Sequence, residues 1–140
     1  MDMDDVVDEE IKLFMRSAIK GDLDGLTRAH SRGVDVDATA GKFNDTAAIL
    51  AAMSGHDHII DYLAKVKADL NKPDIFGHPP IAHAIFSNNV SCIMALYAHG
   101  VSLDFSDREG NSIIDLCIDS ACVDQQTTDV VLELFHNRAA

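Results

Sequence analysis

The chain has 140 residues, of which 47% are hydrophobic, and a net charge of −12, which suits one domain with a continuous core. No apolar run approaches the roughly 18–20 residues that cross a bilayer and no signal segment is visible at the start, so we expect a soluble protein of the cytoplasm, and also of the nucleus. The excess of acids disfavours nucleic acid and anionic membrane as partners and favours a protein with a basic surface.

The first ten residues, MDMDDVVDEE, hold six acids and neither Lys nor Arg. We expect residues 1–10 to form a flexible, solvated tail, as terminal segments often do, with a docking role as the alternative. The folded domain is expected over residues 11–140.

Residues 11–37 predict a pair of helices. Apolar residues at helical spacing favour a first helix over 12–19, which ends at Gly21, and Asp22 is suited to cap a second helix over 23–31. Because this pair has a neighbour on one side only, its outer face should be polar. Four basic residues supply that polarity: Lys12, Arg16, Lys20 and Arg28.

Three further pairs follow, in residues 38–71, 72–104 and 105–136. The expected helices cover 47–54 and 57–66, then 80–87 and 90–98, then 113–120 and 129–136. Thr46 is a plausible N-cap, and Pro80 suits a first helical position. The apolar pattern stalls over 121–128, which predicts an inserted loop with Asp129 capping the last helix.

The segments between the pairs share one pattern, which we call a finger. Residues 68–77, ADLNKPDIFG, combine an extended run, a turn begun by Pro73-Asp74 and a glycine that allows positive φ. The pattern returns at residues 100–110 and, more weakly, at 33–44. A spacing of about 33 residues is the ankyrin period.

The residues themselves resemble the ankyrin family from about Leu13 to Phe135. The best match to the family pattern is Ala51, Ala52, Gly55, His56, Ile59, Ile60 and Leu63, followed by Ala68, Asp69, Leu70 and Asn71. The Thr-Pro-Leu-His signature is degraded in all four copies. The resemblance implies an all-α solenoid of four helix-turn-helix repeats, joined by β-hairpin-like fingers and closed by capping first and last repeats.

No enzyme chemistry is visible. The sequence shows no phosphate loop, nucleophile elbow or paired-acid motif, and we expect neither a catalytic site nor a cofactor. His56 and His58 stand two residues apart and so do not face each other on a helix, and no metal site is expected. Cys92 and Cys117 fall at core positions, whereas Cys122 lies in the predicted loop.

We call the first helix of each pair the inner helix and the second the outer helix. The resemblance implies a protein-binding module whose groove lies between the fingers and the inner helices. Large apolar side chains at these positions are not required by packing and indicate an interaction site. The predicted groove residues are Phe43, Asp45, Met53, Ile75, Phe76, His78, Phe86, His99, Arg108, Glu109, Asn111 and Asp119.

Residues 18–24 and 89–96 resemble the myotrophin-like ankyrin proteins. That resemblance implies a monomeric, stoichiometric inhibitor of actin capping protein. Two alternatives stay open. One is an inhibitor of a kinase or of a Rel-type transcription factor acting through the same groove, and the other is a metal- or thiol-dependent catalyst that uses Cys122.

Overall fold

The computed structural model describes residues 3–138, with side chains from residue 8 onward. Within this range the chain forms eight helices and one pair of short strands. The helices are α1 (Met3–Lys20), α2 (Leu23–Ser31), α3 (Ala47–Ser54), α4 (Asp57–Lys65), α5 (Pro80–Phe86), α6 (Val90–Ala98), α7 (Ile113–Asp119) and α8 (Gln125–Asn137). Strands β1 (Thr39–Ala40) and β2 (Asp45–Thr46) pair antiparallel, with Thr39 opposite Thr46.

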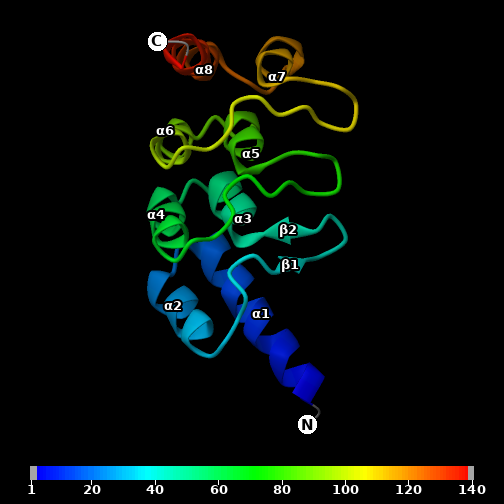
Figure 1. Ribbon diagram of the computed structural model, residues 1–140, viewed down its shortest axis with the longest axis vertical. Helices are drawn as coiled ribbons and strands as arrows, with labels where there is room; N and C mark the ends of the chain where they lie inside the picture. The colour runs from blue at the N-terminus through cyan, green and yellow to red at the C-terminus, as the bar shows by residue number, and fades with distance from the viewer. Residues whose placement is uncertain (1–2, 139–140) are drawn as a thin grey trace.

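The helices stack as four pairs along one axis (Figure 1). Helices α1, α3, α5 and α7 form one column, and α2, α4, α6 and α8 form a second column beside it. The fingers project from the side of the first column that faces away from the second. The all-α solenoid of four helix pairs is therefore confirmed. None of the helices within the described residues combines the length and apolar character needed to cross a membrane.

Side-chain hydrogen bonds explain where several helices begin. The Thr46 hydroxyl accepts the Ile49 N–H at 3.2 Å, and the Asp22 carboxylate accepts the Gly25 N–H at 3.0 Å, so both predicted caps are present. Ser112 and Asp115 form a capping box at the start of α7.

One continuous core runs through all four pairs, from Phe14 in α1 to Leu134 in α8. Cys92 and Cys117 are buried in it, as expected, and burial raises the pKa of each thiol to about 11. Cys122 is exposed. His56 and His58 hold neighbouring repeats together, since each donates from Nε2 at 2.9 Å, to the carbonyl oxygens of Ile19 and Gly21 respectively.

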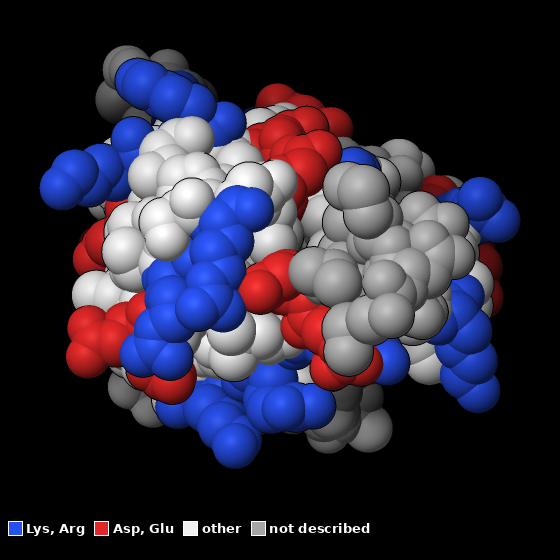
Figure 2. All heavy atoms as spheres, turned by 90° about the horizontal axis from the view of Figure 1, so that it is seen from below, with Lys and Arg blue, Asp and Glu red and all other residues white. Residues whose placement is uncertain are grey.

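The end of the stack formed by α1 and α2 carries many charges. Viewed from that end, Lys and Arg side chains are interspersed with acids on the visible face (Figure 2). The four basic residues predicted to make this face polar, Lys12, Arg16, Lys20 and Arg28, are all exposed.

Two helix starts differ from the prediction. Helix α1 begins at Met3, so the backbone of the acidic segment continues the helix that was expected to start at residue 12. The flexibility of residues 1–10 stays a prediction. Helix α8 begins at Gln125 rather than near residue 129, because Asp124 accepts the Thr127 N–H at 2.8 Å and caps it. The expected loop over 121–128 is correspondingly short, and Asp129 lies inside the helix.

Candidate protein-binding groove

Backbone hydrogen bonds align the tips of the three fingers. The Ile75 N–H donates to the carbonyl oxygen of Phe43, and the Arg108 N–H donates to that of Phe76, both at 3.0 Å. Each finger therefore lies against the next in one register. Gly77 is needed at this contact, because its φ is +82° and an added Cβ would lie 3.0 Å from the Arg108 nitrogen.

This register produces a row of rings along the groove. The ring centroids of Phe43 and Phe76 lie 5.5 Å apart, those of Phe76 and His78 6.3 Å, and those of His78 and Phe86 5.2 Å. Phe43 is 39% exposed and Phe76 is 48% exposed, whereas Phe86 is half-buried against His78 and His83. Two of the aromatic side chains thus remain open to solvent although packing does not require them there.

Two adjoining hollows open on this row. The first, of about 240 Å³, is lined by Phe43, Asp45, Met53, Asp74, Phe76, His78, His83 and Phe86. The second, of about 250 Å³, is lined by Phe76, His78, Phe86, Asp107, Arg108, Glu109, Asn111 and Leu116. Phe76, His78 and Phe86 form the wall between them, so the two hollows make one groove over three successive repeats.

Most of the predicted groove residues meet here. Phe43, Asp45, Met53, Phe76, His78, Phe86, Arg108, Glu109 and Asn111 line the two hollows, and Ile75 joins the fingertips through its backbone. Asp119 is exposed at the end of α7 and lines neither hollow.

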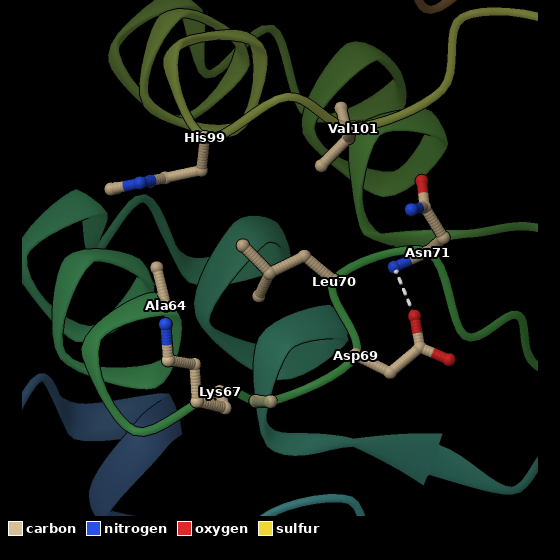
Figure 3. A pocket seen from close by; sticks show the side chains of 8 residues that line it. Ala64, Lys67, Asp69, Leu70, Asn71, His99 and Val101 are labelled. Atoms are coloured by element: carbon tan, nitrogen blue, oxygen red, sulfur yellow. Dashed lines mark hydrogen bonds between the residues drawn. The ribbon is translucent and has the colours of Figure 1, made fainter.

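His99 lies apart from the groove, contrary to the prediction. It follows α6 as its C-cap residue and donates from Nε2 to Asp61 Oδ1 at 2.8 Å. It lines a separate pocket of about 340 Å³, next to Ala64 of α4 and the start of the second finger (Figure 3). Helix α6 belongs to the second column, so the residue that follows it lies on the side of the stack away from the groove.

The groove is also lined by residues outside the predicted set, among them Asp74 and His83. Asp74 is buried, and its Oδ1 accepts the N–H groups of Phe76 and His78 at 2.9 and 3.1 Å. Its Oδ2 accepts a hydrogen bond from His83 Nε2 at 2.8 Å. Asp74 was interpreted only as a turn residue. The sequence signal for its hydrogen-bond partner was His83, in the inner helix that follows the finger.

The same arrangement is repeated in the next finger. Asp107 Oδ1 accepts the N–H groups of Glu109 and Asn111 at 3.0 and 2.8 Å, and its Oδ2 accepts a hydrogen bond from His78 Nε2 at 2.9 Å. Burial acts to raise the pKa of Asp107, but these hydrogen bonds outweigh it and the pKa is lowered. Asp107 therefore stays ionised and fixes the His78 ring.

Burial shifts the pKa of two further groups on the groove floor. It lowers the pKa of His83 although Asp74 acts in the opposite direction, and it raises the pKa of Asp45. The His83 imidazole is thus held neutral, and it lies with carboxylates on the floor beneath exposed aromatic side chains. Such a surface can receive apolar side chains flanked by cations.

Stacked helix pairs with a groove between fingers and inner helices define a helical-repeat binding protein. The family model described as ankyrin repeats (3 copies) matches residues 14–107, and the chain belongs to the ankyrin-repeat family. Ankyrin repeats are protein-interaction modules and are generally not catalysts.

Several curated proteins are similar to this chain. Ankyrin repeat domain-containing protein 37 of Xenopus tropicalis is 26% identical over 101 residues, which are 72% of this chain and 62% of that protein. Transient receptor potential cation channel subfamily A member 1 of Homo sapiens is 29% identical over 90 residues, 64% of this chain and 8% of the channel. Inhibitor of Bruton tyrosine kinase of Mus musculus is 33% identical over 75 residues, 53% of this chain and 6% of that protein. The chain thus spans less than two thirds of each relative.

Proposed function

We propose that this protein is a monomeric, stoichiometric binder of a partner protein that presents a basic surface, and that it uses the groove between the fingers and the inner helices. The observation that carries the proposal is the row of Phe43, Phe76, His78 and Phe86 across neighbouring repeats, with two of its rings open to solvent. Interface cores are enriched in aromatic residues and methionine, and Met53 lines the same hollow.

Aromatic and acidic residues contribute to binding in different ways. Phe43 and Phe76 supply apolar area that is desolvated on binding, and such side chains often cost 2 kcal/mol or more when truncated. The acids, Asp45 and Glu109 among them, attract a basic partner and raise the association rate. The net charge of −12 extends that attraction beyond the groove.

Actin capping protein is the first candidate partner. Support for it comes from the likeness of residues 18–24 and 89–96 to myotrophin-like proteins. These residues lie at the turn between α1 and α2 and over most of α6, and none of them lines the groove. Partner identity and use of the groove therefore rest on different residues and can be tested separately. We place the complex in the cytoplasm, and also in the nucleus.

Inhibition of a kinase is the second candidate function. It is supported by the similarity to Inhibitor of Bruton tyrosine kinase, which covers 53% of this chain. An inhibitor of a kinase or a transcription factor can use the same groove, so the residues in the groove do not separate it from the first candidate.

A double substitution tests the use of the groove. Phe43→Ala/Phe76→Ala should weaken capture of the partner roughly thirty-fold or more and leave the fold intact, because both rings are exposed. Leu132→Ala is the matched control, since Leu132 is 43% exposed on α8, outside the groove and outside residues 18–24 and 89–96. Equal loss in both variants, or no loss in the double variant, would remove the groove from the proposal.

Purified capping protein tests the partner. Titration should give a complex that weakens as salt is raised. Addition of the protein to actin filaments with capped ends should restore growth. No change in filament growth at saturating concentration would exclude capping protein and leave the groove proposal in place for a kinase, which is tested with the same pair of variants.

A further inference from the structure

Three potential metal ligands converge on the floor of the groove. The carboxylate of Asp74 and the ring nitrogens of His78 and His83 lie with their ligand atoms all within 4.8 Å of one another. Asp74 and His78 belong to the second finger and its base, and His83 projects from α5. Two histidines and one carboxylate form a ligand set that zinc takes in proteins.

The structure already orients two of these groups, Asp74 and His83. Two backbone N–H groups fix Asp74 Oδ1, which aims Oδ2 at His83 Nε2, 2.8 Å away. Two ligands of one tetrahedral zinc ion, each bound at about 2.0 Å, are about 3.3 Å apart. An outward movement of about half an ångström therefore converts the hydrogen-bonded pair into two ligands of one ion, while the ring proton moves to Nδ1.

Charge and access favour a cation at the same point. Asp45 and Asp74 line the hollow of about 240 Å³ that contains both histidines. Asp107 Oδ2 lies 2.9 Å from His78 Nε2 and orients that ring. The histidine side chains are 14–19% exposed, so an ion can reach them from the groove.

We propose that Asp74, His78 and His83 bind a divalent transition-metal ion such as zinc on the floor of the groove. The ion would neutralise part of the local negative charge and leave a coordination position directed at the groove. The site goes beyond the proposed function, because it can be occupied in the absence of any partner. Its failure would leave the protein-binding proposal standing.

Calorimetric titration of the full chain with zinc chloride, without partner, tests the site. Cys122→Ser serves as the background because Cys122 is an exposed thiol that can also take the metal. One equivalent should bind. His78→Gln and His83→Gln should each weaken binding at least tenfold, since even outer ligand partners contribute about 10–100-fold.

His99→Gln is the matched control. His99 also donates to an aspartate at 2.8 Å, but among the described residues no third ligand meets that pair. This variant should bind zinc like the background, and zinc should raise the Tm of both but not that of His78→Gln. If all variants bind zinc equally, or if the background binds none, the cluster is only a pair of hydrogen bonds. Should His83→Gln fail to fold, His78→Gln decides, because its ring is more exposed.

Discussion

The backbone N–H of Arg108 donates to the carbonyl oxygen of Phe76 at 3.0 Å. One repeat earlier, Ile75 makes the same bond to Phe43. The spacing of the fingertips is therefore set by main-chain atoms, and the side chains of the groove can differ without changing it. For this reason a truncated ring should remove contact area and leave the frame of the groove in place.

Truncation of a central core residue should be costly. Leu63 in α4 is fully buried, and Leu63→Ala should lower the free energy of unfolding by about 2–5 kcal/mol through lost burial and a new cavity. Urea unfolding followed by circular dichroism measures this. Leu132→Ala is the control, because Leu132 is 43% exposed on α8, and it should change stability by about 0.5 kcal/mol or less. Equal effects would argue against the packing described.

The start of α8 can be tested with two aspartates. Asp124→Ala should lower the Tm because it removes the cap, whereas Asp129→Ala should have little effect, since Asp129 only accepts a bond from the exposed Gln125 side chain. If Asp129→Ala lowered the Tm more than Asp124→Ala, the helix would instead begin near residue 129.

The same cap predicts a pH dependence. The hydrogen bond from the Thr127 backbone holds the pKa of Asp124 below its ordinary value of 3.8. A carboxyl group with a lowered folded-state pKa stabilises the protein above its unfolded pKa and loses that effect as pH falls through the folded value. The Tm difference between the parent chain and Asp124→Ala should thus be full at neutral pH and shrink below pH 3.8. A difference that is constant with pH would contradict this.

Strain at the end of α4 can be relieved. Lys67 has φ +68°, in the region that favours glycine. Lys67→Gly should raise the free energy of unfolding by up to about 1 kcal/mol. Lys65→Gly, at the last residue of α4, is the control and should not raise it, because Lys65 has no positive φ to relieve. Thermal melts of the two variants compare them directly, and a loss of stability in both would show that Lys67 makes contacts that outweigh the strain.

Removal of residues 1–8 should change the Tm little, because Phe14 is the first buried residue of α1 from Asp8 onward, where side chains are described. Phe14→Ala provides the contrast and should cost about 3–5 kcal/mol. Circular dichroism of the deletion variant reports the helix content that the segment supplies. Unfolding of the deletion variant would overturn the expectation of a dispensable tail.

Interactions within a few residues explain what the sequence could predict. Thr46 and Asp22 cap helices through bonds to residues three positions ahead, and the fingers repeat a local turn pattern. Helix α8 was misplaced because its first buried residue is Thr127, a polar residue that interrupts the apolar period. The sequence therefore predicts the existence of α8 more reliably than the residue at which it begins.

The groove was predicted less completely because its floor is built across the chain. His78 meets Asp107 over a separation of 29 residues, and nothing local to either residue indicates the pair. The aromatic row could be predicted, because the position of a residue within its repeat indicates whether it faces the groove. His99 was wrongly assigned to the groove because it lies between an outer helix and the next finger. At this point a shift of one residue changes the side of the stack that a side chain faces.

Phe76 forms part of the wall shared by both hollows of the groove. The chain contains no tryptophan, so Phe76→Trp would give the molecule a single indole fluorophore at the centre of that wall. Its emission would respond to any occupant of either hollow, whether a side chain of a partner or an ion on the floor. The groove thereby offers a built-in position for an optical reporter that needs no attached dye.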